Sequence, residues 1–488
     1  MTVSTASTES PPAAAAAGKL PLSSLTAMVI GSMVGAGIFN LPGRFATATG
    51  PFGSLIAWAI AGTGMYMLGR VFQFLALKRP DIDSGVFAYA KAGFGDYVGF
   101  LSAFGYWIGS VLGNVFYWVL IGSTLGLFFP GLFGDGTSIV AILVSLVGVW
   151  AFHFMILGGV EEATFVNKIV TVAKVVPLIV AVLLFIFFFN YSQFRENFFG
   201  GVGMPEKSLV AQVRDTMLIT VFVFIGIEGA SVYSRFAGKR SDVGAATVLG
   251  FVAVTGLMVA ITLLPYAVAP RAAIAGVANP SLAGALELAV GPWGAVLISV
   301  GVLVSVLGAF LAWTLICAEV LFAAGKSQDM PRVFGAQNSK RVPVVALWVS
   351  NIVVSLFVIS TYWSRDAFNF MLDMTSVTTL LPYLLVAGYG VLLARSGVGY
   401  ETTPGERRRD QIFAWIAVIY TLFMFVAAGL KFVLLMAVLF VPSTILYFWA
   451  RREQNLRLFT PVELIIFAVT LIGGAIGFYG LVTGLITP

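Results

Sequence analysis

The sequence contains almost none of the two residue types that most often build catalytic and metal sites. Its 488 residues include one cysteine, Cys317, and one histidine, His153. A single cysteine excludes a disulfide within the chain and any cysteine cluster for a metal or an iron–sulfur centre. His153 lies in an apolar run without an evident partner, so histidine-rich metal sites and Ser/His/Asp catalysis have almost no support. We therefore expect no metal and no cofactor, and interpret both side chains as packing residues.

Charge is scarce as well. Charged residues make up 10% of the chain, whereas hydrophobic residues make up 59%. Water does not solvate such a chain, so its solvent must be lipid. Apolar stretches of about 18 to 30 residues, long enough to cross a bilayer, recur from residue 22 to residue 486 with only short breaks. Because backbone exposed to lipid must bond within its own segment, this pattern predicts an all-α integral membrane bundle.

We predict about 13 transmembrane helices. The expected spans are 22–42, 52–76, 97–129, 138–156, 163–189, 209–235, 243–269, 284–325, 342–361, 367–395, 411–428, 431–450 and 461–486. Residues 1–18 have no apolar core or cleavage site of a signal peptide, and are predicted to form a disordered cytoplasmic tail.

Lysine and arginine concentrate in every second loop, as the positive-inside rule requires for cytoplasmic loops. This pattern places the N-terminus in the cytoplasm and, with an odd number of spans, the C-terminus outside. It also accounts for the net charge of +6. No nucleic-acid partner is therefore expected.

Two of the spans are interrupted by glycine. The first carries GSMVGAGIF at 31–39, with three glycines within seven residues, and the sixth carries FVFIGIEGASV at 222–232, where two glycines flank Glu228. Each glycine costs a helix about 1 kcal/mol relative to alanine. Glycines at the first site alone would also fit a packing face of small residues. A matching break five spans later, carrying a carboxylate, instead indicates the binding site of a transporter.

The spacing of five spans indicates two repeats of opposite orientation. We expect a first repeat at 19–200, a second at 201–400 and additional helices at 401–488. The broken helices of such repeats face one cavity at the bundle centre. Freed amides there can bind a carboxylate and freed carbonyls an ammonium group. An α-amino acid presents both groups.

A few ionisable residues fall inside the predicted spans, where burial is costly and each is a site hypothesis. Glu228 could pair with a cationic side chain or take up a proton. Lys174 could supply a fixed positive charge in the bundle, or extend its ammonium to the inner surface. Glu319 and Asp373 would suit a dicationic substrate, or would each bond a neighbouring helix. Phe222 and Trp313 lie near the breaks and could stack on a guanidinium, although either could equally be a packing residue.

Four sequence runs carry a family resemblance over nearly all of residues 22–486. These are GSMVGAGIFNLP in the first span, DSGVFAYAKAGFGDYVGFLSAFGYWIGSVLGN at 83–114, FIGIEGASVYSR at 224–235 and LGAFLAWTLICAE at 307–319. With them the chain resembles the amino acid–polyamine–organocation superfamily, most of all its basic amino acid/polyamine antiporter branch. Within that branch it is most similar to bacterial arginine/ornithine antiporters, with lysine permeases as the nearest neighbours.

The resemblance implies a LeuT-type 5+5 inverted repeat and a set of site residues. The first-span backbone would hold the substrate carboxylate, at Ser32, Met33, Gly35, Ala36 and Gly37. Ile225 would hold the α-amino group, Phe222 would be an aromatic gate and Trp313 would stack on the guanidinium. The remaining pocket positions are Tyr106, Ser110, Asn114 and Thr375. Glu228 matches a proton-sensing glutamate, and Lys174 a lysine that occupies the sodium position of related folds.

Three residues depart from the arginine/agmatine exchanger of the same branch. Phe222 replaces a tryptophan, Ser110 replaces a cysteine, and Glu319 stands where that exchanger has an uncharged residue. Glu319 would favour a substrate with a free α-carboxylate and a basic side chain over a decarboxylated diamine.

The function that we predict is exchange of arginine for ornithine by alternating access in a bacterial cell membrane, with the chain as a multi-pass protein and a possible homodimer. The alternative is uptake of lysine or arginine driven by membrane potential or protons. An intramembrane enzyme would need a paired nucleophile and base, and an ion channel a filter loop or rings of charge. Neither pattern is evident in the sequence.

Overall fold

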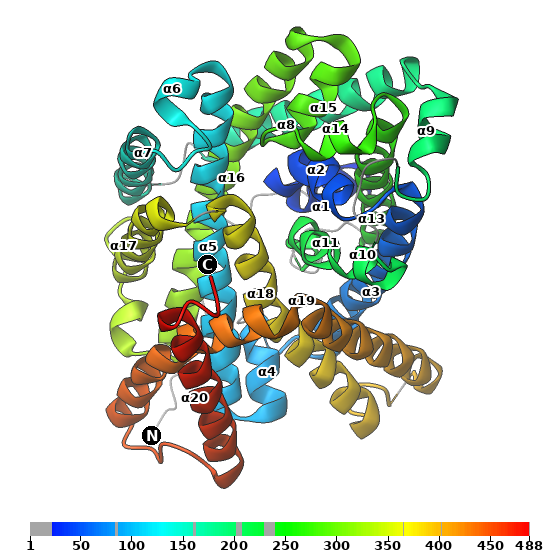
Figure 1. Cartoon of the computed structure of the whole chain (residues 1–488). Coiled ribbons are helices and arrows are strands. Elements are labelled where there is room, and N and C mark those ends of the chain that lie inside the picture. The colour runs from blue at the N-terminus through cyan, green and yellow to red at the C-terminus, as the bar shows by residue number, and fades with distance from the viewer. Residues whose placement is uncertain are drawn as a thin grey trace, which may run out of the picture.

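The structure is a computed structural model, and it describes residues 22–82, 86–159, 163–201, 207–228, 240–364, 366–401 and 403–487. Nearly all of these residues are helical (Figure 1). Nine helices in the described part of the chain are long and apolar enough to cross a membrane, or up to eleven when each bent pair is counted as one span. The predicted bundle of apolar helices is therefore confirmed.

The first predicted span is broken in two. Helix α1 (Leu22–Met33) contains Gly31 in its last turn and ends before Gly35. The chain resumes as a 3-10 turn, η1 (Ala36–Asn40), that runs directly into α2 (Leu41–Ala48). Gly35 between them has an extended backbone, with φ −104° and ψ −172°. The two halves are bent by 50° relative to one another.

The sixth predicted span is also interrupted within its described residues. It begins as α10 (Leu209–Arg214) and α11 (Met217–Phe224), and residues 225–228 then form a turn. The rest of the predicted span, 229–235, lies outside the described residues. The described part of each glycine-rich run thus leaves the α-helical conformation.

Ten further helices account for the other spans. They are α3 (Pro51–Lys78), α5 (Asp96–Phe128), α7 (Ile139–Leu157), α8 (Ala163–Phe187), α13 (Arg240–Leu263), α16 (Pro292–Lys326), α17 (Val344–Ser360), α18 (Ala367–Ser396), α19 (Pro404–Glu453) and α20 (Pro461–Val482). Helix α19 contains both the eleventh and the twelfth predicted spans, which meet at Gly429, where the backbone is not helical.

The eighth span differs from its prediction at its start. Residues 284–325 were expected to form one helix, but the chain forms α15 (Ser281–Val290) and then α16. Gly291 separates them with a φ of 88°, and Pro292 follows at the start of α16. A positive φ suits glycine and ends the helix, while proline is well placed in a first helical turn. Helix α15 joins short helices α9 (Tyr191–Asn197) and α14 (Arg271–Ala275), and turn η3 (Leu264–Ala267), near α2.

Helix α5 forms the centre of the bundle (Figure 1). It packs against α16 and α18, and 83% of its most apolar stretch is buried inside the protein. Glycines permit the close approach to α18. A Cβ atom on Gly109 would lie 2.8 Å from the hydroxyl oxygens of both Thr378 and Thr379. The hydrophobic core therefore surrounds the helix that carries several of the predicted pocket residues.

Ion pairs fasten the ends of these helices on the face where the predicted inner loops lie. Lys91 of α4 (Val86–Phe94) contacts Asp329 at 2.5 Å, and Lys78 contacts Glu406 at 3.0 Å. The hydrogen bond from Lys78 holds the pKa of Glu406 below its ordinary value. Several of the basic residues that set the predicted topology thus also join neighbouring helices.

Candidate functional site

The two breaks lie in direct contact. Gly226 has a φ of +107°, and a Cβ atom added to it would lie 2.4 Å from the carbonyl oxygen of Ser32. A Cβ atom on Gly37 would lie 2.5 Å from Cδ1 of Phe222. Real Cβ atoms do not approach other atoms so closely, so only glycine fits at these two positions without rearrangement. The glycines that break each helix thus also permit the two breaks to meet.

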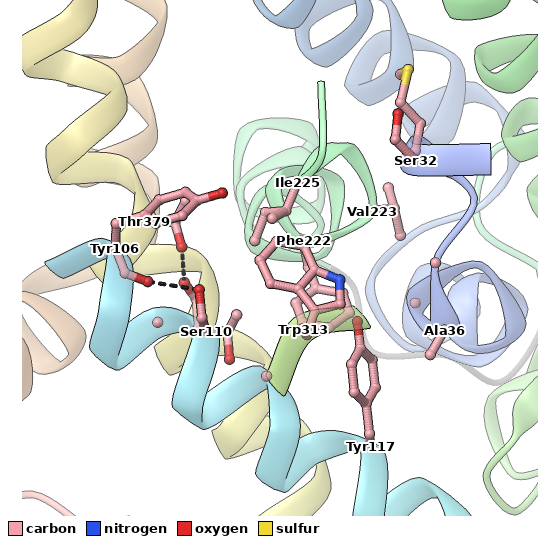
Figure 2. Close-up of a pocket in the computed structure, with 16 residues that line it drawn as sticks. Ser32, Ala36, Tyr106, Ser110, Tyr117, Phe222, Val223, Ile225, Trp313 and Thr379 are labelled. Atoms are coloured by element: carbon pink, nitrogen blue, oxygen red, sulfur yellow. Dashed lines mark hydrogen bonds between the residues drawn. The ribbon is translucent and has the colours of Figure 1, made fainter. Parts of the chain in front are cut away.

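A cavity lies where the breaks meet α5, α16 and α18. Sixteen residues line it (Figure 2). Eleven of them are among the predicted substrate-binding residues, namely Ser32, Met33, Gly35, Ala36, Gly37, Tyr106, Ser110, Phe222, Ile225, Trp313 and Thr375. In Figure 2, Phe222, Trp313 and Ile225 lie between Tyr106 and Ser110 of α5 on one side and Ala36 on the other.

Sequence reasoning missed five of the lining residues, which are Gly109, Gly113, Tyr117, Val223 and Thr379. Three of these continue the face of α5 that begins at Tyr106 and Ser110, at intervals of three or four residues. Helical periodicity could have found them, since residues at those intervals share a face. Val223 directly follows Phe222, and Thr379 lies one turn after Thr375.

The first-span backbone opens onto the cavity at Gly35. A Cβ atom there would find no heavy atom within 4 Å. Turn η1 begins at the next residue, and the first amides of a helical segment have no partner within it. Such amides carry partial positive charge and favour an anion. A substrate carboxylate could therefore bind here without a basic side chain.

Glu228 does not itself line the cavity, but it bonds to Tyr106, which does. Its carboxylate accepts hydrogen bonds from the hydroxyl groups of Tyr106 at 2.6 Å and Tyr383 at 2.7 Å, and from the backbone amide of Gly226 at 3.1 Å. Tyr106 belongs to α5 and Tyr383 to α18, so one carboxylate joins the second break to two core helices. Tyr383 follows Glu228 by 155 residues, and no local pattern in the sequence connects them.

Lys174 reaches the other break. Its Nζ donates a 2.7 Å hydrogen bond to the carbonyl oxygen of Gly31, in the last turn of α1. The residue is 8% exposed, so its ammonium group lies inside the bundle and not at the inner surface. A positive charge is favourable at a helix C-terminus. Lys174 therefore stabilises the end of α1 just before the break.

Two other predicted residues do not line the cavity. Asn114 donates from Nδ2 to Thr314 Oγ1 at 3.5 Å and to Cys317 Sγ at 3.6 Å, which turns its amide toward α16. Glu319 is exposed, and lines a separate hollow with Ile156 and Pro343 among others. The structure thus separates Glu319 from the residues gathered between the breaks.

Asp373 and His153 have partners that the sequence did not reveal. Asp373 forms a 2.6 Å ion pair with Arg44 of α2. The arginine offsets the negative charge of Asp373, which the sequence indicated as a candidate partner for a dicationic substrate. His153 Nδ1 lies 3.0 Å from Nδ2 of Asn351, and its ring packs edge-on against Trp348. Cys317 is fully buried, as expected of a packing residue.

The fold and the cavity define a class of protein. Two broken helices that enclose a central site within a membrane bundle are the architecture of a secondary transporter. The solved structure of MhsT in complex with L-phenylalanine has a similar fold, with a TM-score of 0.56 and 19% identity, over 84% of this chain and 99% of that one. The predicted LeuT-type 5+5 inverted repeat is confirmed.

The chain belongs to the amino acid permease family, whose model matches residues 20–451. Among its relatives is an arginine/ornithine antiporter of Pseudomonas aeruginosa, 47% identical over 96% of this chain and 98% of the relative. An L-lysine transport protein of Corynebacterium glutamicum is 40% identical over 97% of each chain. An arginine/agmatine antiporter of Chlamydia abortus is 36% identical over 89% of this chain and 90% of the relative. The predicted superfamily is confirmed, and the chain is a multi-pass membrane transporter.

Proposed function

We propose that this protein exchanges arginine for ornithine across a bacterial cell membrane by alternating access. The observation that carries the proposal is the meeting of the two broken helices at one cavity, in a chain that is 47% identical to an arginine/ornithine antiporter over nearly its full length. Both amino acids carry a charge of +1 at neutral pH. Their exchange therefore moves no net charge.

The amino-acid end of the substrate binds backbone groups. The amides at Gly35, Ala36 and Gly37 bind the α-carboxylate, and the carbonyl of Ile225 accepts from the α-ammonium group. Backbone groups suit this task because every α-amino acid presents the same two charges. Recognition of this end therefore sets the class of substrate and leaves the choice among amino acids to the side-chain end.

The cationic end of the substrate lies against aromatic rings. Trp313, Phe222 and Tyr117 line the cavity, and a guanidinium or ammonium group over such a face gains about 0.5–2 kcal/mol. Glu228 supplies negative charge behind Tyr106, with which it shares a hydrogen bond. In this proposal Glu228 also responds to pH, and Lys174 supplies the fixed charge at the end of α1.

The test is counterflow in proteoliposomes that contain the purified protein. Vesicles loaded with ornithine should accumulate external radiolabelled arginine many times faster than vesicles loaded with buffer. A panel of internal amino acids, including lysine and citrulline, then ranks the exchange partners. Equal uptake into loaded and empty vesicles would contradict exchange.

A second candidate function is favoured by the relative named L-lysine transport protein. In that case lysine or arginine enters alone, driven by membrane potential or protons. An inside-negative potassium diffusion potential separates the two. Uptake without a counter-substrate would then rise with the potential, whereas one-for-one exchange of two +1 amino acids would not.

The proposal includes the arrangement in the membrane. The N-terminus is cytoplasmic, the C-terminus lies outside, and the chain acts as a carrier without enzymatic activity. A cysteine label at each end, tested from the outside of intact cells with an impermeant reagent, checks the orientation. The possible homodimer stays a prediction, which cross-linking in native membranes would test.

A further inference from the structure

Arg271, the first residue of α14, is a buried arginine that binds backbone oxygens. It is 4% exposed. Its guanidinium donates from Nε to Ala46 O at 2.6 Å, from Nη1 to Gly200 O at 2.7 Å and from Nη2 to Thr47 O at 3.2 Å. Within the described residues, Arg271 forms no ion pair with a carboxylate. Carbonyl groups therefore take the place of a carboxylate partner.

Two of these oxygens belong to the last turn of α2. The final carbonyls of a helix have no partner within it, and they carry partial negative charge. The planar fork of an arginine can satisfy two of them at once. Arg271 thus caps the C-terminus of α2, the outer half of the first span.

Arg271 is itself fixed by a neighbouring residue. Asn197 of α9 accepts from the backbone amide of Arg271 at 2.9 Å through Oδ1. Its Nδ2 donates to the carbonyls of Tyr266 at 2.7 Å and Ala269 at 2.9 Å. The cap therefore belongs to a hydrogen-bonded group formed by α9 and the segment 264–290, which we call the outer group.

Two further bonds join α2 to the same outer group. The amide of Gly43, in the first turn of α2, donates to Ser281 Oγ of α15 at 2.9 Å. The hydroxyl of Tyr266 donates to the carbonyl of Thr49, just after α2, at 2.8 Å. Helix α2 is thus bonded at both ends to the segment 264–290, which contains η3, α14 and α15 (Figure 1).

The end that Arg271 caps is connected to the cavity by continuous helical structure. Residues 36–48 form η1 and α2 without interruption, a length of roughly 20 Å at about 1.5 Å per residue. Ala36 and Gly37, which line the cavity, are at the opposite end of this segment. Because a tilt of about 5° over that length moves one end by about 2 Å, the cap controls the position of these amides.

We propose that Arg271 is a positioning residue for the substrate carboxylate. It holds the direction of the segment 36–48, and thereby holds the amides at its start where a carboxylate can bind. This inference rests on the proposed function, in which those amides bind the α-carboxylate. Arg271 does not itself line the cavity.

Agmatine provides a test, because it is arginine without the carboxylate. We would measure the dissociation constants of both compounds for the purified protein, by binding of radiolabelled arginine and by competition with agmatine. Arg271→Met should weaken arginine about tenfold, a loss of about 1.4 kcal/mol, and agmatine less than about twofold. The arginine affinity of Arg271→Lys should lie between those of the wild type and Arg271→Met, since lysine keeps the charge but loses the planar fork of the guanidinium.

Matched variants separate positioning from general damage. Arg195→Met removes an exposed arginine of the neighbouring helix α9, and should leave both affinities unchanged. Tyr266→Phe removes the bond from the outer group to Thr49, just after α2. It should lower the ratio of arginine affinity to agmatine affinity, as Arg271→Met does, but by a smaller factor. If Arg271→Met does not fold, the Arg271→Lys and Tyr266→Phe proteins carry the same comparison.

The outcomes distinguish the inference from the proposed function. Equal losses of arginine and agmatine in the Arg271 variants, or no loss of either, would overturn the positioning role. If the wild-type protein itself bound the two compounds equally well, the assignment of the carboxylate to the amides at 35–37 would be wrong, and this inference with it.

Discussion

The two halves of the broken first span are held in different ways. One half is α1, which the proposed orientation makes the inner half. It receives a hydrogen bond from Lys174 at its last turn and packs against α13. The outer half, η1–α2, is bonded at its first turn by Ser281, in its middle by Arg44 with Asp373, and at its end by Arg271. A cation thus caps the C-terminus of each half, and within the described residues the outer half has more hydrogen bonds to other segments.

This difference predicts different roles for the two halves in transport. A segment fixed at several points keeps a binding site in shape, whereas a segment with fewer fixed contacts can move at lower cost. We expect the outer half to hold the carboxylate site and the inner half to move during the transport cycle. Alternating access requires such a combination of a fixed site and a moving gate.

The largest effect is expected where the two breaks touch. Gly226→Ala would place a Cβ atom 2.4 Å from the carbonyl oxygen of Ser32, at a φ of +107°. A strained backbone of this kind costs about 1–3 kcal/mol before the overlap is counted. Arginine exchange should fall by about 100-fold or more, measured as the initial rate into ornithine-loaded vesicles.

Gly256→Ala, in α13 and outside the cavity lining, is the matched control for this prediction. Its Cβ atom would find no heavy atom within 4 Å, so the fold has room for it. The exchange rate should fall far less than in Gly226→Ala. Equal losses in the two variants would show that the contact between the breaks is not what matters.

Removal of the charge that caps the inner half should slow transport more than it weakens binding. Lys174→Met deletes a charged hydrogen bond, worth about 1.5–3 kcal/mol, at the end of α1. The maximal exchange rate should fall about tenfold or more, with a change in arginine affinity of less than about threefold. The opposite pattern, a loss of affinity at unchanged rate, would assign Lys174 to the binding site.

Glu228 connects the second break to the core helices, and its removal should have an intermediate effect. Glu228→Gln weakens the hydrogen bonds from Tyr106 and Tyr383 and removes the group that could take up a proton. We expect roughly a tenfold lower rate, by analogy with the loss of a charged hydrogen bond, and a flatter dependence on pH. Rates equal to wild type at every pH would make Glu228 a structural residue.

A smaller effect should separate substrates from one another. Trp313→Ala removes a ring that lines the cavity, and a cation over such a ring gains about 0.5–2 kcal/mol. The loss of affinity should be larger for arginine, whose planar guanidinium stacks, than for lysine. Equal losses, measured by competition in one binding assay, would discard the stacking role.

The smallest effect is expected at Glu319. Its side chain is exposed beside a separate hollow that includes Ile156 and Pro343. Glu319→Gln should therefore change arginine affinity by less than about twofold, within the range of ordinary surface substitutions. A tenfold loss would return Glu319 to the substrate site that the sequence predicted for it.

The sequence was a good guide to the membrane helices and to the breaks, because both depend on local composition. Apolar runs and glycine clusters are visible without any knowledge of tertiary structure. The break between α15 and α16 was not predicted, although the sequence contains a signal for it. Gly291 and Pro292 form a Gly-Pro pair, which commonly marks a turn.

Contacts between distant segments could not be predicted in this way. Arg44 and Asp373 lie 329 residues apart, and Arg271 lies 225 residues from Ala46. The rule that buried polar groups need partners predicts that Arg271 has one, but it does not say where the partner lies. The predicted site residues came mainly from the family resemblance, which supplied no assignment for Tyr117 or Tyr383.

The most direct measurement compares movement in the two halves. Cys317 is buried, so spin labels can be attached to introduced cysteines at the exposed positions Thr47 and Ala273 in one protein, and Ala27 and Leu77 in another. Electron paramagnetic resonance then reports each distance with and without arginine. We predict that substrate leaves the Thr47–Ala273 distance unchanged and shifts the Ala27–Leu77 distance. A shift of the outer pair with a constant inner pair would contradict the division between a fixed outer half and a moving inner half.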